Sequence, residues 1–176
     1  MKNRRVVVTG MGALTPIGNS INEFWKNLVD GKSGADKITL FDAAKFKTKF
    51  ACEVKGFQAE DYLDRKEARR LDRFCQLALV VADQALTDSK LLSSNFNKER
   101  TGVIWGSGIG GLTTMLQETK SFLNSGESPR LNPFFIPKII SDIPAGHISI
   151  KYGLKGPNYS AVSACASASN AIINAF

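Results

Sequence analysis

"NYSAVSACASASNAI" (residues 158–172) sets a single cysteine, Cys165, in a run of alanines and serines. The first seven residues favour a strand, and a helix is expected to start at or just after Cys165. Side chains this small leave clearance for a tight turn and for the close approach of a ligand, which bulky neighbours would block. The stretch therefore predicts a strand–turn–helix unit with a thiol at the turn.

Cys165 has two interpretations. Unpaired cysteines are among the most buried residue types, and we expect Cys75 and Cys52 to be core residues of this kind. A helix start instead favours a thiolate, because its free backbone N–H groups and its dipole attract negative charge. A nucleophilic cysteine normally needs a partner base. The single histidine, His147, lies in a predicted helix upstream, where a packed structural role is the commoner one.

Strand and helix patterns alternate along the rest of the chain. Residues 4–10 and 101–108 each predict a strand that ends at glycine. Ser20 with Glu23 predicts a capped helix that stops at Gly31, and Asp64 with Glu67 predicts the cap of a second, long helix. The apolar face of that long helix comprises Leu71, Phe74, Cys75, Ala78, Val81, Ala82, Ala85 and Leu86. Further helices are expected over residues 111–124 and up to Tyr152, so the chain reads as a layered α/β fold with a partly parallel sheet.

Two glycine loops follow predicted strands. Residues 106–111, GSGIGG, match the G-x-G-x-x-G pattern of dinucleotide-binding proteins, and residues 9–15, TGMGALT, nearly do. The acidic residue that should hold a ribose about 20 residues later is poorly placed in both cases, since Glu127 lies among prolines. We therefore favour close backbone packing for these glycines and keep nucleotide binding as an alternative. Ile109, at the tip of the first loop, is expected to face a cavity.

Composition limits the classes of function. The chain is 43% hydrophobic and 22% charged, and it has no apolar run long enough to span a membrane. The first apolar run is too short for a secretory signal, so we expect a soluble, cytoplasmic protein. Three scattered cysteines and one histidine argue against a disulfide framework and against a metal site. A formal net charge of +7 suggests an acidic partner, which could be a nucleic acid, an anionic lipid or an acidic protein.

Taken together, these segments resemble the amino-terminal half of the β-ketoacyl-acyl carrier protein synthases, most closely the elongating type II enzymes of bacterial fatty-acid synthesis. The resemblance runs from residue 4 to the end. It rests on RRVVVTGMGALTPIGN, RKEARRLDRF, GSGIGG, NPFFIP and AGHISIKYGLKGPNYSAVSACASASNAI. It implies a thiolase-like, layered α-β-α-β-α fold, of which residues 1–176 would be the N-terminal half. The whole protein would be a homodimer.

The resemblance also implies roles for particular residues. Cys165 matches the nucleophile that takes an acyl chain from acyl carrier protein, before malonyl-carrier protein loses carbon dioxide and attacks it in a Claisen condensation. Ile109 and Phe135 match positions that line the acyl pocket. In this family a basic surface receives the acidic carrier protein. Its positions are matched here by four basic residues, Lys66, Arg69, Arg70 and Arg130. Neither a metal nor an organic redox cofactor is implied, and neither a nucleic acid nor a membrane is expected as a partner.

One departure from the family is large. Its two catalytic histidines, a lysine and a gating phenylalanine loop lie downstream of the cysteine, beyond residue 176. We therefore expect a chain truncated within the helix after the nucleophile, and a fragment that does not condense malonyl-carrier protein alone. His147 does not match either of those histidines. Two rival hypotheses are a coenzyme A-dependent, thiolase-like acyltransferase and a non-catalytic subunit that assembles with a catalytic partner.

Overall fold

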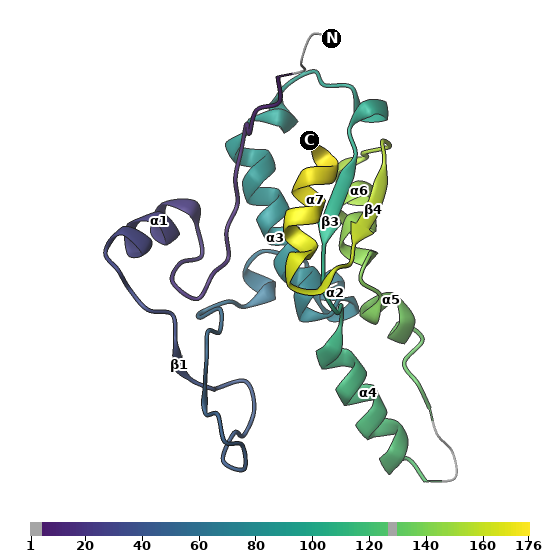
Figure 1. The fold of residues 1–176 in the computed structure, drawn as a ribbon. Coiled ribbons are helices and arrows are strands. Elements are labelled where there is room, and N and C mark those ends of the chain that lie inside the picture. Colours follow the sequence, from purple (N-terminus) through teal and green to yellow (C-terminus); the bar gives the residue numbers. More distant parts are fainter. Residues whose placement is uncertain (1–4, 127–129) are drawn as a thin grey trace.

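The computed structural model describes residues 5–126 and 130–176. Figure 1 shows a central group of helices around two strands, with the segment that carries α1 and β1 set to one side. The helices are α1 (Ile21–Val29), α2 (Arg65–Arg70), α3 (Arg73–Asp88), α4 (Leu112–Asn124), α5 (Phe135–Ile139), α6 (Ile143–Tyr152) and α7 (Ser167–Ala175). The strands are β1 (Asp36–Lys37), β2 (Phe50–Ala51), β3 (Val103–Gly106) and β4 (Asn158–Ala161). Short 3₁₀ turns cover Ala59–Asp61, Leu91–Ser93, Lys98–Arg100 and Ala164–Ala166.

The sheet at the centre is parallel. β3 pairs with β4 in a register that runs from Val103 opposite Asn158 to Gly106 opposite Ala161. α7 and α6 both pack on this pair, and α3 packs on α6. Figure 1 shows α7 and α3 to the left of β3, with α6 behind the strands. This layering of helix, sheet and helix confirms the predicted α/β class with parallel pairing.

α3 is the centre of the hydrophobic core. Cys75 and Leu79 are 0% exposed, and Val80 is also buried. They form one cluster with Phe57, Leu63, Leu71, Ile148 and Leu154 from the surrounding segments. The predicted apolar face of this helix was partly wrong, because it omitted Leu79 and Val80. The helix is covered on more than one side, which broadens its buried stripe.

The single long helix predicted after Asp64 is in fact two helices. The Asp64 carboxylate caps α2 as predicted, accepting hydrogen bonds from the N–H groups of Lys66 and Glu67. Leu71 is extended, with φ −112° and ψ 145°, and the chain restarts as α3 with Asp72 as its N-cap. The reason is long-range: the Asp72 carboxylate also accepts the N–H of Thr114 on α4, at 2.8 Å. A helix that continued through Leu71 and Asp72 would lose this cap, which ties α3 to α4.

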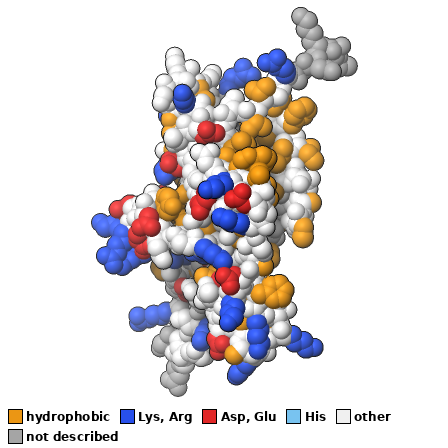
Figure 2. Space-filling model, turned by 90° about the vertical axis from the view of Figure 1, so that its left-hand side faces the viewer, with side chains coloured by type: hydrophobic (Ala, Val, Ile, Leu, Met, Phe, Trp, Pro, Cys, Tyr) orange, Lys and Arg blue, Asp and Glu red, His pale blue; other side chains and the backbone are white. Residues whose placement is uncertain are grey.

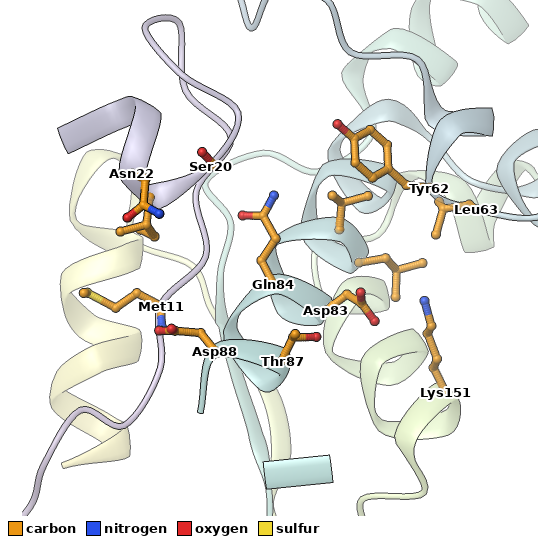
Figure 3. Close-up of a pocket in the computed structure, with 13 residues that line it drawn as sticks. Met11, Ser20, Asn22, Tyr62, Leu63, Asp83, Gln84, Thr87, Asp88 and Lys151 are labelled. Carbon is orange, nitrogen blue, oxygen red and sulfur yellow. The ribbon is translucent and has the colours of Figure 1, made fainter. Parts of the chain in front are cut away.

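The strand predicted over residues 4–10 is not formed in residues 5–10, which are extended and pair with no strand in the described part of the chain. Val8 is 80% exposed. The next residues are held by α3 side chains, since Met11 N–H donates to Asp88 at 2.9 Å and Ala13 N–H donates to Gln84 at 2.8 Å. Figure 3 shows Met11 reaching Asp88 beside Gln84, at the edge of a cleft of about 510 Å³. The segment is thus anchored to a helix in place of a sheet.

Most other predicted boundaries are confirmed. α1 ends two residues before Gly31, α4 matches the helix expected over residues 111–124, and α6 ends at Tyr152 as predicted. The Ser20 hydroxyl caps α1 by accepting the N–H of Glu23 at 3.2 Å, although the Glu23 carboxylate reaches back to the N–H of Asn19. β4 is shorter than expected and ends at Ala161. Figure 2 shows hydrophobic side chains gathered at the upper right of this face, with basic side chains at its top, at its left and at its lower end.

None of the helices in the described residues is both long enough and apolar enough to cross a bilayer.

Candidate functional site

Cys165 lies at the turn between a strand and a helix. β4 ends at Ala161, Cys165 is the middle residue of the 3₁₀ turn Ala164–Ala166, and α7 begins at Ser167. The Cys165 thiol is exposed, so the core interpretation of this cysteine is wrong. The turn is strained at Ala164, where φ is +48°. A residue with a Cβ atom adopts that left-handed conformation at a cost of roughly 1–2 kcal/mol.

Side-chain hydrogen bonds hold the turn closed. The buried Ser167 hydroxyl accepts the N–H of Ser163 at 2.9 Å and donates to the carbonyl of Ala164 at 2.7 Å. The Asn170 amide donates to the Ser163 hydroxyl at 2.6 Å. These bonds tie the two residues before Cys165 to Ser167 and Asn170, which follow it. Ser163, Ser167 and Asn170 were not predicted as functional residues, although the sequence shows the spacing of the two serines.

The glycine loop of residues 106–111 packs directly against this turn and against α5. A Cβ atom on Gly106 would lie 2.6 Å from the carbonyl oxygen of Ser167, and one on Gly108 would lie 3.3 Å from that of Ala164. On the other side, Gly110 and Gly111 leave no room for a Cβ atom against the carbonyls of Ile139 and Lys138. Protein backbone thus approaches these glycines too closely for any larger residue. These contacts favour the packing interpretation; Glu127, the candidate ribose ligand, lies outside the described residues.

Ile109 borders an apolar hollow, as its position at the loop tip predicted. The hollow has a volume of about 330 Å³ and is lined by Ile109, Gly111, Leu112, Met115, Ile139, Ile140 and Ser141. Ile109 is 71% exposed at its mouth. Phe135 is partly buried and does not line the hollow. It belongs to α5, whose last residue does, and the N–H of Gly111 donates to Ile139 at 3.0 Å.

The basic residues singled out in the sequence lie on and near α2. Lys66, Arg69 and Arg70 are exposed, while Ala68 faces the core. The Arg70 guanidinium stacks over the ring of Phe134, 5.5 Å from its centre, which links α2 to the start of α5. Arg130 is also exposed, but no ion pair or cation–π contact in the described residues joins it to α2. The structure therefore brings three of the four together on one helix.

The remaining candidates have different environments. Cys75 is fully buried as predicted, and burial, with Asp72 nearby, raises the pKa of its thiol to about 12. Cys52 is exposed, so its predicted place in the core is wrong. It follows β2, whose two-residue pairing with β1 stands apart from the core cluster. His147 is partly buried within α6, and no hydrogen bond joins it to Cys165 in the described residues.

Within residues 5–126 and 130–176, no group of three or more His, Cys, Asp or Glu side chains is arranged to hold a metal ion.

The site thus combines an exposed thiol on a strand–turn–helix unit with a neighbouring glycine loop and an apolar hollow. The family model for the N-terminal domain of β-ketoacyl synthases matches residues 3–176, and the chain belongs to this family. Over all 176 residues it is 46% identical to the 3-oxoacyl-[acyl-carrier-protein] synthase 2 of Synechocystis sp. (strain ATCC 27184 / PCC 6803 / Kazusa). It spans 42% of that relative's length.

Solved structures confirm the fold. A β-ketoacyl synthase from Burkholderia phymatum STM815 superposes with a TM-score of 0.78 at 26% identity, covering 99% of this chain and 43% of that one. A ketosynthase in complex with its type II polyketide acyl-carrier protein, bound to the hexaketide, gives a TM-score of 0.77 at 23% identity. That alignment covers 97% of this chain and 45% of that one. The predicted thiolase-like α/β half is thus confirmed.

Proposed function

We propose that this chain is the amino-terminal portion of a type II β-ketoacyl-acyl carrier protein synthase that elongates fatty acids. Cys165 would be its nucleophile. The observation that carries the proposal is the exposed Cys165 thiol at the strained turn between β4 and α7. The 46% identity to a 3-oxoacyl-[acyl-carrier-protein] synthase 2 supports the choice of reaction.

The reaction has two stages. In the first, the Cys165 thiolate attacks the thioester carbonyl of an acyl-carrier protein, and the carrier's thiolate leaves and takes up a proton. In the second, malonyl-carrier protein loses carbon dioxide, and its α-carbon attacks the acyl carbonyl on Cys165. The new carbon–carbon bond displaces the Cys165 thiolate.

Ile109 and Phe135 would line the path of the acyl chain. Two observations support this proposal: the apolar hollow beside Ile109, and the contact of Gly108 with Ala164. Together they bring an apolar surface next to the turn that carries the Cys165 thiol. Phe135 would act through α5, whose last residue, Ile139, lines the same hollow. We propose that this hollow continues into the acyl pocket of the whole protein.

Lys66, Arg69, Arg70 and Arg130 would receive the acidic carrier protein. The exposure of all four side chains and the net charge of +7 support this. The complex of a related fold with its type II acyl-carrier protein supports the kind of partner. Arg70 would be less free than the others, because its guanidinium already stacks on Phe134.

The rest of the synthase would lie in sequence beyond this chain, which spans less than half the length of its curated relative. That part would supply the groups that decarboxylate malonyl-carrier protein. We propose a cytoplasmic homodimer. Exposed apolar side chains directly after β4 and on α7, among them Val162 and Ile172, support an assembly that covers them.

The test uses the full-length protein that carries this chain and compares Cys165→Ala with Cys52→Ala. We expect Cys165→Ala to lose β-ketoacyl product formation from acyl- and malonyl-carrier protein by at least about 1,000-fold, as when a covalent nucleophile is removed. Cys52→Ala should match the parent, because Cys52 lies apart from the turn. A Cys165→Ala protein that elongates acyl chains at the parental rate refutes the assignment.

A further inference from the structure

We propose that Ser167 is a positioning residue that holds the Cys165 turn in its reactive shape. The inference rests on the proposed function of Cys165 as the acyl acceptor. Ser167 does not need to touch the substrate for this role. Its hydroxyl links the start of α7 to Ser163 and Ala164, the two residues before the cysteine, and acts through the backbone.

The geometry is a closed ring of hydrogen bonds. The Ser167 hydroxyl oxygen accepts the N–H of Ser163, and its proton goes to the carbonyl of Ala164. These two partners come immediately before Cys165 in the chain, while Ser167 itself begins α7. The first residue of α7 is therefore hydrogen-bonded to the segment that follows β4, on the other side of Cys165 in the chain.

The burial of Ser167 makes water a poor substitute for these hydrogen bonds. Ser167 is 4% exposed, so its hydroxyl has little access to water that could replace either partner. If the turn relaxed, the buried Ser167 hydroxyl would lose both of its partners inside the protein. The Asn170 amide reinforces the same unit by donating to the Ser163 hydroxyl at 2.6 Å.

The residue under strain is the one that Ser167 holds. Ala164 has a φ of +48°, which a residue with a Cβ atom rarely adopts unless its surroundings enforce it. The hydrogen bond from Ser167 fixes the Ala164 carbonyl, and this same carbonyl lies against Gly108. Losing the hydroxyl should let Ala164 return to ordinary backbone angles, which would turn the Cys165 thiol and disturb the loop that carries Ile109.

Glycine offers a direct way to separate this role from general packing. A glycine at position 164 adopts positive φ as readily as negative φ, so it keeps the turn accessible without the hydroxyl. Ala164→Gly should therefore rescue a Ser167→Ala protein if Ser167 acts by enforcing the left-handed backbone. A purely structural loss at Ser167 would not be repaired by that substitution.

The experiment uses the full-length protein with Cys52→Ser, so that Cys165 is the accessible thiol of this chain. Ser167→Ala, Ser167→Ala with Ala164→Gly, and the control Ser169→Ala are compared. The readouts are kcat and KM for acyl transfer from acyl-carrier protein and the rate of Cys165 alkylation by iodoacetamide. Ser169 is exposed on the same helix and makes no side-chain hydrogen bond within the described residues.

We expect Ser167→Ala to lower kcat and alkylation by at least about 10-fold, with KM changed less than about twofold, because a misplaced reacting group slows the step without weakening binding. The added Ala164→Gly should recover most of that loss, and Ser169→Ala should match the parent. Parental rates in Ser167→Ala, or a loss that Ala164→Gly does not repair, overturn the inference.

Folding and the proposed function are checked separately. If Ser167→Ala does not fold, the double variant decides: a folded, reactive protein supports the inference, and a folded protein with a slow Cys165 contradicts it. Failure of the proposed function looks different, since Cys165→Ala would then still accept acyl chains whatever residue stood at position 167.

Discussion

Burial separates the three cysteines of this chain. Cys165 and Cys52 are exposed, whereas Cys75 lies in the centre of the core with a pKa raised to about 12 by loss of solvent. The thiolate is the reactive form, so burial and a low thiolate fraction both protect Cys75. We expect iodoacetamide at pH 8 to modify Cys52 and Cys165 in the native protein, and to modify Cys75 only after denaturation. Peptide mapping checks this. Modification of Cys75 in the native protein would contradict its burial in the hydrophobic core.

The same shift predicts how stability depends on alkaline pH. The unfolded chain ionises Cys75 near its ordinary value of 9.0, whereas the folded protein keeps it protonated up to about 12. Its contribution is fully present below pH 9.0 and is lost as pH rises from 9.0 towards 12. We expect the free energy of unfolding of the full-length protein to fall less steeply over this range in Cys75→Ala than in the parent. Parallel slopes for the two proteins would contradict this account of Cys75.

At this scale the sequence was a good guide to Cys165 and a poor one to Cys52. The small residues around Cys165 encode the local turn, so strand, thiol and helix could be read in order. The exposure of Cys52 depends on where the β1–β2 pair stands relative to the core, and no local pattern carries that. The role of Ser167 could not be predicted for a related reason. Its two hydrogen bonds, to Ser163 and Ala164, depend on the three-dimensional shape of the turn.

At the scale of elements, Asp72 joins two helices with one carboxylate. It caps α3 through the N–H of Phe74 at 3.2 Å and accepts the N–H of Thr114 on α4 at 2.8 Å. Asp64 makes a comparable cap on α2 without a long-range partner. We expect Asp72→Ala to destabilise the full-length protein by about 2–4 kcal/mol and Asp64→Ala by about 1 kcal/mol, measured by chemical denaturation. Equal losses for the two variants would show that the tie to α4 is not stabilising.

The glycine loop gives a second test at this scale. Gly110 has a φ of +90°, and a Cβ atom there would lie 2.2 Å from the carbonyl oxygen of Ile139. Gly31 also has positive φ, but its Cβ position is open space. We expect Gly110→Ala to cost about 3 kcal/mol or more, because strain and collision with α5 add, while Gly31→Ala costs about 1 kcal/mol from the backbone alone. Thermal unfolding of both variants measures the difference, and a Gly110→Ala protein as stable as Gly31→Ala would contradict the packing role.

Sequence patterns predicted α1, α4, α6 and the parallel strand β3, because each is encoded by local caps, glycines and apolar spacing. The sequence patterns gave wrong predictions where a residue far away in the sequence determines the local structure. The break between α2 and α3 depends on Thr114, and residues 5–10 have β-branched side chains but no strand beside them in the described residues. A strand needs a pairing partner as well as a pattern.

At the scale of the whole molecule, the basic surface distinguishes a carrier protein from coenzyme A as the acyl donor. We expect Lys66→Glu combined with Arg69→Glu to lower kcat/KM about 10-fold or more with carrier-linked substrate at low salt, since reversing two charges repels an acidic partner. Rates with the coenzyme A-linked substrate should change little. Lys26→Glu, on the exposed side of α1, is the control and should leave both rates unchanged.

Salt provides the internal check on that prediction. The defect with the carrier-linked substrate should shrink as ionic strength rises, because exposed charges are screened. An equal loss of kcat/KM with both substrates, or a loss that salt does not affect, would contradict the proposal that Lys66 and Arg69 bind the carrier protein.

The central proposal is that Cys165 carries the acyl chain. The direct measurement is to mix the full-length protein with an acyl-carrier protein thioester in the absence of malonyl-carrier protein, quench with acid, digest, and locate the acyl mass by tandem mass spectrometry. The account predicts the acyl group on the peptide that contains Cys165, and none on the peptides that contain Cys52 or Cys75. An acyl group on another residue, with the Cys165 peptide unmodified, would contradict it.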